Sequence, residues 1–528
     1  MISAAGRAFD PVALPRTRIS PNHLAAAATV GLFVALALFG AAVHWVEEAG
    51  TAERDGYVAQ AEQVLAGRLP HDPFRPLLYP LLTAGLATVV GNPFAAARLI
   101  SNAAAALLAW LAWRTGRDLA GTRCGAWAFV LVAVNPNLWI LGQHASTDML
   151  FAALGAGVLT ALVPLVDRPS ALSSRAVIAA GLLFGLAAFT RGNALFFLPG
   201  VALGFLLAPI SWRTRLRWLA LFAIAALPGF AAQWTTRAIS FGSPFYDENW
   251  KNLAWKLYGG SDWSYLDRVP FHSAREVVRA DPMRVLFGGI REVLRFVKSG
   301  FAQLAGTWAH ALTFGIGVAA ATWRRHRSAL WLLTSTAIFT VALALAFFTW
   351  GRLLLAFLPT IAAISAYPLS AEWGGDRGRR LGTLAATALV VLLAAKTFLF
   401  RLPAFGARHP YGEIAALRAL EDSASPSSAL AGTSPFLGRY LDRHYVALPD
   451  AFGPEKSEPS IWFDRLKTFL AIENVEFLVV SEIDLRDRPA SLLGATPPTP
   501  WLERVPTEDF SGPRSGSRVV VWRVRYKP

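Results

Sequence analysis

Long apolar segments recur along this chain from residue 24 to residue 400. An α-helix that crosses the hydrocarbon core of a bilayer needs about 20 predominantly apolar residues. The pattern therefore predicts an α-helical polytopic membrane protein with about eleven membrane spans. The expected spans cover residues 24–43, 94–113, 124–142, 148–166, 176–190, 193–210, 218–236, 301–322, 328–348, 352–370 and 381–400.

A further apolar run, at residues 76–90, is shorter than a span and opens with Arg75-Pro76. Cytoplasmic loops carry an excess of Lys and Arg. The N-terminal tail and five arginine-rich loops fall on one face only if residues 76–90 do not cross. We therefore expect this run to lie in the outer interface and the N-terminus to be cytoplasmic. The arginines that decide this are Arg7, Arg16, Arg18, Arg114, Arg117, Arg123, Arg168, Arg175, Arg213, Arg215, Arg217, Arg324, Arg325, Arg327, Arg377, Arg379 and Arg380.

This topology places two long loops, residues 44–93 and 237–300, on the outer side of the membrane. The first loop is expected to contain a helix at residues 53–67, with acidic side chains in its first turn and Gly67 at its end. The second loop ends in an amphipathic basic helix, Met283 to Lys298, of the kind that lies in the headgroup layer. Both loops are therefore expected to form structure at the membrane surface.

The tail from residue 401 to residue 528 changes composition and is expected on the outer side as well. A helix is expected near residues 411–421, and an apolar run follows it at residues 429–433. Buried-strand and alternating patterns follow at residues 475–480 and 518–524. The chain is therefore expected to consist of a transmembrane domain, 1–400, and a small extracytoplasmic α/β domain, 401–528.

Composition supports the membrane assignment, since 54% of the residues are hydrophobic and only 16% are charged. The net charge of +15 lies largely in the expected inner loops and interfacial segments, so it indicates topology and lipid contact and does not predict nucleic-acid binding. The single cysteine, Cys124, excludes an intramolecular disulfide. No zinc-type Cys/His cluster, phosphate-binding loop or dinucleotide fingerprint is present in the sequence.

Ionisable side chains inside spans are costly, and each one is a candidate functional residue. On the expected topology only His310 lies in the middle of a span. A transporter would place such residues near the bilayer midplane. The pattern instead favours chemistry at the outer interface, where the headgroup of a lipid substrate would lie. The ionisable residues near the outer ends of spans are Arg98, Asp148, Arg191, Arg352 and Lys396.

Several short elements follow one another in a characteristic order. They are Asp55 and Tyr57 in the first loop helix, the run Ala61 to Gly67, the segment Arg75 to Pro80, Ala97-Arg98-Leu99, Thr147-Asp148 and Thr190-Arg191-Gly192. In this order and spacing the chain resembles the GT-C superfamily of glycosyltransferases that use polyprenyl-phosphate sugars. It is most similar to the group of protein O-mannosyltransferases and the lipid A aminoarabinose transferase. The resemblance covers residues 24–400. One departure is Gly56, where the family often has Glu after the Asp.

The resemblance implies inverting transfer of a sugar from a polyprenyl-phosphate donor to a hydroxyl of a glycan, lipid or protein acceptor. It implies a multi-pass protein of the plasma (inner) membrane. No cofactor is assigned, no metal ligand is proposed, and dependence on a divalent metal is left open. The candidate site residues are Asp55 and Asp148 as catalytic groups, Arg191, Arg98 and Arg352 as ligands of the donor phosphate, and Tyr57, His71, Tyr79, Asp247, Asn249 and Asn252 as acceptor or sugar contacts.

Each candidate also has a structural interpretation. Asp55 could complement the N-terminus of the loop helix, and Asp148 follows Ser146, a natural N-cap. Arg191 could extend to the interface without binding a ligand. At the level of function, a flippase or polymerase of lipid-linked sugars and a non-catalytic membrane scaffold remain alternatives. A flippase would need a polar groove to the inner face, which the expected inner halves of the spans do not offer.

Overall fold

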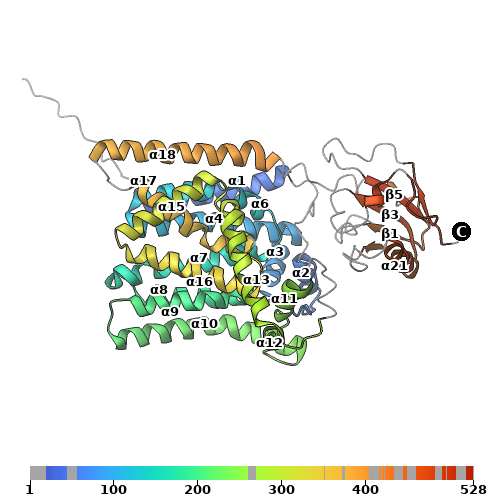
Figure 1. Ribbon diagram of the computed structural model, residues 1–528, viewed down its shortest axis with the longest axis horizontal. Helices are drawn as coiled ribbons and strands as arrows, with labels where there is room; N and C mark the ends of the chain where they lie inside the picture. The colour runs from blue at the N-terminus through green and yellow to red at the C-terminus, as the bar shows by residue number, and fades with distance from the viewer. Residues whose placement is uncertain are drawn as a thin grey trace, which may run out of the picture.

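The computed structural model describes residues 20–43, 56–259, 269–349, 351–370, 375–403, 416–417, 419–420, 423–432, 444–448, 459–481, 490–494, 496–506 and 519–526. The first part of the chain is a helical bundle, and the tail contains a small β-sheet (Figure 1). Asp55, the expected catalytic base, and residues 53–54 of the expected loop helix lie outside the described residues.

The long elements of the bundle match the expected spans closely. They are α1 (Pro21–Val43), α4 (Pro93–Ala120), α5 (Thr122–Ala133), α6 (Pro136–Gly142), α7 (Thr147–Asp167), α8 (Ser174–Thr190), η3 (Gly192–Phe197), α9 (Leu198–Leu207), α10 (Trp212–Phe241), α15 (Trp308–Trp323), α16 (Arg327–Ala346), η7 (Gly351–Phe357), α17 (Leu358–Ser370), α18 (Gly375–Ala395) and η8 (Lys396–Arg401).

The shorter elements lie in the two long loops. They are α2 (Tyr57–Leu65), α3 (Leu78–Val90), α11 (Trp250–Ala254), η4 (Trp255–Gly259), α12 (Ala274–Ala280), α13 (Pro282–Arg295), η6 (Phe296–Gly300) and α14 (Phe301–Ala305), while η2 (Pro169–Ala171) follows α7. Helix α2 ends before Gly67, whose φ of 71° suits glycine, as the sequence predicts. The expected amphipathic helix is α13, which continues through η6 and α14 to Ala305.

Within the described residues, seven helices are long and apolar enough to cross a membrane, judged by length and composition. Two bent pairs also pass this test: α5 with α6, bent by 54°, and the helix at 282–305 with α15, bent by 105°. The expected spans at 176–190 and 193–210 correspond to shorter apolar helices, as does the interfacial run at 76–90. The chain is therefore a multi-span membrane protein, and the crossing of the shorter helices stays a prediction.

The bend at the start of α15 interrupts the expected span at residues 301–322, as the smaller bend between α5 and α6 interrupts the one at 124–142. The prediction of a continuous helix over 301–322 is wrong, because the chain turns at Gly306, which has a φ of 90°. A Cβ on Gly306 would lie 2.8 Å from Leu393 Cδ1 and 3.0 Å from Pro136 Cδ, so only glycine fits this turn. As a result His310 lies in the first turn of α15 and not in the middle of a span.

The arginine-rich loops meet at one end of the bundle. Arg117 Nη1 donates to Asn22 Oδ1 at 2.7 Å, and Arg123 Nη2 donates to the Arg379 carbonyl at 2.9 Å. We call this the basic end. Helix α7 has 21 residues, so its two ends lie about 30 Å apart. Asp148 therefore lies at the other end of the bundle, which we call the pocket end.

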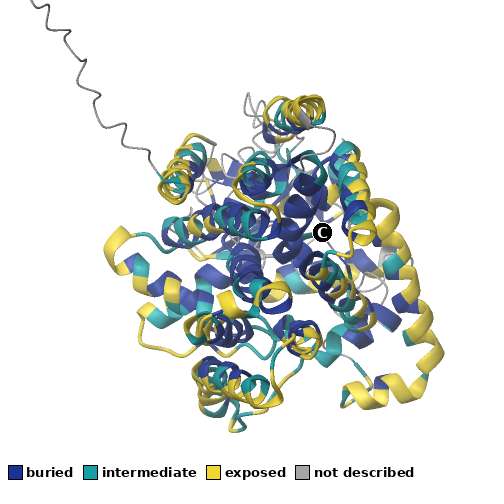
Figure 2. Cartoon of the chain, turned by 90° about the vertical axis from the view of Figure 1, so that its left-hand side faces the viewer, coloured by how far each residue is buried: buried dark blue, intermediate teal, exposed yellow. Residues whose placement is uncertain are grey.

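Burial separates the central helices from the peripheral ones (Figure 2). Helices α7 and α17 are almost completely enclosed by other helices, whereas α1, α10 and α18 expose most of their apolar residues. Helix α10 packs tightly against α8 because glycines let the backbones approach. A Cβ on Gly185 would lie 2.3 Å from the Ala226 carbonyl oxygen, and one on Gly229 would lie 2.2 Å from the Gly185 carbonyl oxygen.

The described part of the tail contains a five-stranded sheet with strand order β2-β1-β3-β5-β4. Strand β1 pairs in parallel with β2 and β3, while β5 is antiparallel to β3 and β4. This confirms the expected α/β character and the strands predicted near 475 and 518, while the apolar run at 429–433 contains a further strand. Of the helix expected at 411–421, residues 416–417 and 419–420 are described and helical. The elements are β1 (Ala429–Gly432), β2 (Tyr445–Ala447), α21 (Pro459–Ile472), β3 (Val475–Ser481), η11 (Ala490–Leu493), β4 (Leu502–Arg504) and β5 (Val519–Val524).

Candidate functional site

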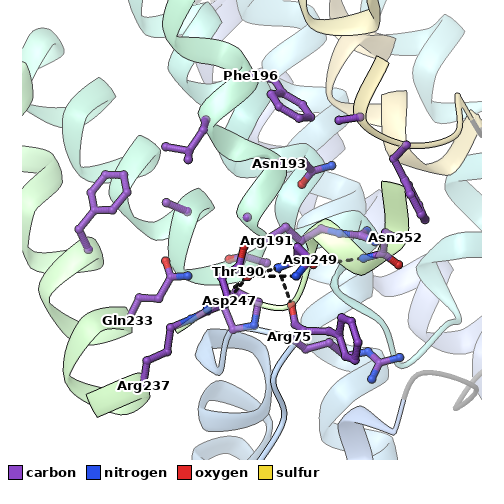
Figure 3. A pocket seen from close by; sticks show the side chains of 18 of the residues that line it. Arg75, Thr190, Arg191, Asn193, Phe196, Gln233, Arg237, Asp247, Asn249 and Asn252 are labelled. Atoms are coloured by element: carbon purple, nitrogen blue, oxygen red, sulfur yellow. Dashed lines mark hydrogen bonds and ion pairs between the residues drawn. The ribbon is translucent and has the colours of Figure 1, made fainter. Parts of the chain in front are cut away.

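A cavity of about 630 Å³ opens at the pocket end of the bundle (Figure 3). One side of it is polar and carries four arginines, and another side is an apolar wall. The polar lining residues are Tyr57, Arg75, Thr190, Arg191, Asn193, Gln233, Arg237, Asp247, Asn249, Asn252 and Arg352. The apolar wall includes Leu195, Phe196, Phe230, Trp234, Phe245, Leu343, Phe347 and Leu353.

A buried carboxylate lies behind two of these arginines. Asp148, in the first turn of α7, is 1% exposed and forms an ion pair with Arg191, at the end of α8. Arg352 Nη1, from η7, approaches the other carboxylate oxygen at 3.6 Å. Ser146 Oγ donates to the same oxygen at 3.2 Å and also caps the helix. A buried charge requires such partners, so Asp148 fixes both guanidinium groups at the edge of the pocket.

A third arginine is fixed by a tight turn in the first long loop. Asp72 Oδ1 accepts the backbone N–H groups of Phe74 and Arg75 at 2.8 and 2.9 Å. Its Oδ2 accepts Arg75 Nη1 at 3.0 Å and Gln60 Nε2 at 2.7 Å. Asp72 thus joins α2 to this turn and orients the Arg75 side chain, which lines the pocket. The Arg75 guanidinium also lies over the Tyr57 ring, 5.9 Å from its centroid.

The fourth arginine comes from α10. Arg237 donates through both terminal nitrogens to Asp247 Oδ1, each at 3.2 Å. Asn249 Nδ2 donates to the same oxygen at 2.6 Å and to the Phe74 carbonyl at 3.2 Å. These bonds connect the second long loop to the first. Figure 3 shows the Gln233 and Arg237 side chains beside Asp247 on this side of the pocket.

The same loop has a local acid–base pair next to the pocket. Burial opposes ionisation of Glu248, but hydrogen bonds from Lys251 and Tyr246, each 2.8 Å long, outweigh it and lower the pKa of Glu248. Glu248 N also donates to the Pro73 carbonyl at 3.4 Å. The segment from Asp247 to Asn252 is therefore an ordered pocket wall held to the first loop.

Six of the candidate residues line the pocket: Tyr57, Arg191, Arg352, Asp247, Asn249 and Asn252. Tyr57 is 3% exposed, and its hydroxyl shares a 3.1 Å hydrogen bond with Thr147 Oγ1, beside Asp148. This bond holds α2 against the start of α7. The side chains at this end of α2 and α7 therefore belong to one packed site.

Besides Asp148, which lies behind Arg191 and Arg352, three described candidates do not line the pocket. Tyr79 is fully buried behind Tyr57, and its hydroxyl donates to the Ala97 carbonyl at 2.8 Å. His71 packs against Phe241 with ring centroids 4.2 Å apart. Arg98 Nη1 approaches the Gly40 carbonyl of α1 at 3.4 Å, and its guanidinium lies over Phe94. The contacts named here join α1, α3, α4 and the two long loops.

Four further polar residues line the pocket without being among the candidates predicted from the sequence: Arg75, Asn193, Gln233 and Arg237. The sequence offers one indication of a site role for Arg75, since this cation directly precedes the proline at the start of the apolar run. Arg237 was missed because the apolar segment stops at residue 236, whereas α10 continues to Phe241. Asn193 Oδ1 is a buried pocket atom without a hydrogen-bond partner among the described residues. No three His, Cys, Asp or Glu side chains of the described part of the chain come together as a metal site.

Comparisons with known proteins agree on one architecture. Residues 74–234 match the family model for dolichyl-phosphate-mannose-protein mannosyltransferases. No curated protein sequence matches the chain significantly. Among solved structures, ArnT from Cupriavidus metallidurans bound to undecaprenyl phosphate is 15% identical with a TM-score of 0.52, covering 94% of this chain and 98% of ArnT.

A second similar structure is the oligosaccharyltransferase of Archaeoglobus fulgidus in complex with Zn and sulfate. It is 15% identical with a TM-score of 0.50, and the match covers 85% of this chain and 68% of that protein. At these identities the structures share the fold. The family model covers the segment from Phe74 to Trp234, which carries Arg75, Asp148 and Arg191. Residues 74–234 are thus similar to the mannosyltransferase family, and the chain shares its fold with ArnT and the archaeal oligosaccharyltransferase.

Proposed function

We propose that this chain transfers a sugar from a polyprenyl-phosphate-linked donor to an acceptor hydroxyl at the membrane surface. The observation that carries the proposal is the pocket, in which Arg75, Arg191 and Arg352 converge beside an apolar wall. Guanidinium groups bind phosphate through charge-assisted hydrogen bonds, and apolar side chains suit an isoprenoid chain. A pocket with both features in one cavity fits a lipid phosphate.

The neighbours in fold support this ligand class. ArnT was solved with undecaprenyl phosphate, and the oligosaccharyltransferase from Archaeoglobus fulgidus was also solved with an inhibitory peptide and a dolichol-phosphate. Both ligands combine a polyprenol with a phosphate. The four arginines and the apolar wall of the present pocket suit the same combination. The acceptor is a glycan, lipid or protein hydroxyl, and the pocket alone does not select among these.

The proposed reaction is a single inverting displacement. The acceptor oxygen attacks the anomeric carbon, the bond from that carbon to the phosphate oxygen breaks, and its electron pair leaves with the lipid phosphate. Arg191 and Arg352 stabilise the negative charge that develops on this phosphate. Asp148 is proposed to act through them, since it holds both and does not itself line the pocket. The phosphate leaves as a stable anion, so no general acid is needed.

Asp55 is the proposed general base that takes the proton of the acceptor hydroxyl. Its support is its place in the sequence, two residues before Tyr57, which lines the pocket. A carboxylate here would complete the site with a group of the required chemistry.

The proposed location is the plasma (inner) membrane, with the pocket end on the outer side and the N-terminus in the cytoplasm. The support is the grouping of Arg117, Arg123 and Arg379 at the basic end, because cytoplasmic ends of membrane proteins are enriched in such residues. On this orientation the donor headgroup would enter the pocket from the outer interface.

The proposal is tested with sugar transfer from a panel of polyprenyl-phosphate sugars in membranes that carry the chain. Arg191→Gln should abolish transfer from the donor that the wild type uses, because it removes a phosphate ligand. Arg168→Gln, at the basic end, is the matched control and should leave transfer unchanged. Equal transfer by wild type and Arg191→Gln would refute the assignment of this pocket as the donor site.

A further inference from the structure

The connection between α16 and η7 carries part of the pocket wall. Helix α16 ends at Ala346, Phe347 lines the pocket, and Arg352 follows in the first turn of η7. The position of residues 344–349, which we call the hinge segment, therefore sets where the Arg352 guanidinium lies relative to the pocket and to Asp148.

The start of the hinge segment is held by the π-helical turn η4. Lys256 Nζ donates a hydrogen bond to the Ala344 carbonyl. The neighbouring Trp255 ring packs edge-on against Phe348, with centroids 5.1 Å apart. Two adjacent residues of the second long loop thus bind the hinge segment at its beginning and near its end.

Helix α13 holds the end of the hinge segment. Thr349 Oγ1 donates to the Glu292 carbonyl at 3.0 Å, and Thr349 N donates to the Glu292 carboxylate at 3.3 Å. The carboxylate also accepts Arg295 Nη2 at 2.6 Å, and Glu292 is only 3% exposed. Burying a carboxylate is unfavourable unless it is paired and hydrogen-bonded, so these contacts identify Glu292 as a fixed connection between α13 and the hinge segment.

The two faces of α13 have different neighbours. Gly289 faces α16, and a Cβ there would lie 2.7 Å from Leu345 Cδ2, so the helices pack closely at this point. On other positions of α13, large apolar side chains stay more than 45% exposed, and basic residues accompany them, as expected for a helix in the headgroup layer. These side chains are Met283, Leu286, Phe287, Ile290 and Leu294. Helix α13 therefore packs against α16 through one face and leaves an apolar face exposed, which suits contact with a membrane surface.

We propose that Glu292 is a positioning residue for Arg352, and that α13 sets the affinity of the pocket for the lipid phosphate through the hinge segment. The proposal rests on the proposed function, since it concerns the same anion site. The proposal extends the site to Glu292, which lies outside the pocket and 60 positions before Arg352 in the sequence. This residue would determine whether the Arg352 guanidinium is in place.

The first test does not depend on any ligand. Glu292→Ala removes the side-chain acceptor of Thr349 N, so hydrogen exchange of the amides of residues 344–349 should become faster in the full-length protein. Glu292→Gln keeps an acceptor oxygen and should restore most of the protection. Glu276→Ala, in α12, is the matched control because its carboxylate accepts the backbone N–H of His272 within its own loop. Unchanged exchange in Glu292→Ala would overturn the proposal.

The second test measures binding of undecaprenyl phosphate to the purified protein in nanodiscs. Arg352→Ala should raise the dissociation constant about tenfold, as expected for loss of a charge-assisted hydrogen bond. Glu292→Ala alone should raise it by a smaller factor, and should have no further effect in the Arg352→Ala background. Additive effects of the two substitutions would show that Glu292 does not act through Arg352 and would refute the proposal.

Two outcomes separate this inference from the proposed function. If the wild type does not bind undecaprenyl phosphate, the proposed donor class is wrong, while the exchange experiment still decides whether Glu292 fixes the hinge segment. If Glu292→Ala does not fold, Thr349→Val provides the second variant. It removes the hydroxyl contacts with the Glu292 carbonyl and carboxylate and should shift exchange and binding in the same direction.

Discussion

Asp148 and Arg191 lie 43 residues apart in the sequence and form an ion pair where α7 begins and α8 ends. Arg352 approaches the same carboxylate from η7. One buried acid therefore connects three separate elements at the pocket end. The arrangement keeps two guanidinium groups beside the pocket without a bound ligand, which is the preorganisation that stabilisation of a leaving phosphate requires.

Asp148→Asn should weaken both folding and ligand binding. Two arginines would lose their buried counter-charge, and breaking a buried pair costs about 3 kcal/mol of unfolding free energy. Thermal unfolding and the dissociation constant for undecaprenyl phosphate measure the two effects. Asp167→Asn, at the other end of α7, is the control, since Asp167 contacts Ser328 and His326 at the basic end. Unchanged lipid binding in Asp148→Asn would contradict the positioning role.

Arg75→Ala should raise the KM for the donor about tenfold, because one charge-assisted hydrogen bond to the phosphate is lost. Asp72→Asn should raise the KM for the donor by a smaller factor than Arg75→Ala, because the turn that orients Arg75 loses its negative charge but keeps its shape. Steady-state kinetics with the purified enzyme measure both. Arg68→Ala changes an exposed arginine of the same loop and serves as the control. An equal KM for Arg75→Ala and Arg68→Ala would exclude Arg75 from the donor site.

The lowered pKa of Lys256 should make the stability of the protein depend on pH. Burial lowers the pKa of Lys256 from 10.5 to about 8, although Glu292 opposes this shift, and Arg291 and Arg295 add to it. Between pH 8 and pH 10.5 the Lys256 amine is therefore more often protonated in the unfolded chain than in the folded protein. Its effect on the free energy of unfolding is to make the protein more stable as the pH rises through this window. Lys256→Met removes the contribution. The melting temperature of the wild type should rise relative to Lys256→Met from pH 8 to pH 10, and parallel pH profiles would contradict the prediction.

Gly185→Val should disrupt the contact between α8 and α10. A Cβ at Gly185 lies 2.3 Å from a backbone carbonyl, which cannot move as a flexible side chain can. Overpacking of this kind costs about 1–3 kcal/mol. It should also weaken lipid binding, since α8 leads into Arg191 and α10 carries Arg237. Gly31→Val is the control because no atom lies within 4 Å of its added Cβ. Equal melting temperatures for the two variants would refute the packing argument.

The helical elements could be predicted from the sequence because a bilayer requires long apolar helices wherever the chain crosses it. The bend at Gly306 could not. The residues on both sides of Gly306 are apolar. Hydropathy gives the length of an apolar segment but does not show whether its helix axis changes direction. The predicted place of His310 in the middle of a span was wrong for this reason. The interfacial assignment of residues 76–90 came from charge, and the short helix α3 is compatible with it.

The candidate site was only partly predictable. Asp148, Arg191 and Arg352 could be found because ionisable groups in spans need partners, and the three do pair. Arg98 fits the same rule, but its guanidinium faces α1 and Phe94. The contribution of Arg75 depends on the turn made by Asp72, a tertiary arrangement that spacing in the sequence does not reveal. Which cations share one cavity is decided by helix packing and loop contacts.

Asp55 is proposed to deprotonate the acceptor hydroxyl beside the arginine-lined pocket. The most direct measurement is transfer from the preferred polyprenyl-phosphate sugar by Asp55→Asn, with donor binding measured on the same preparation. The account predicts that transfer is lost while donor binding persists, because Asn cannot accept the proton and the arginines remain in place. Transfer at the wild-type rate by Asp55→Asn would contradict the account.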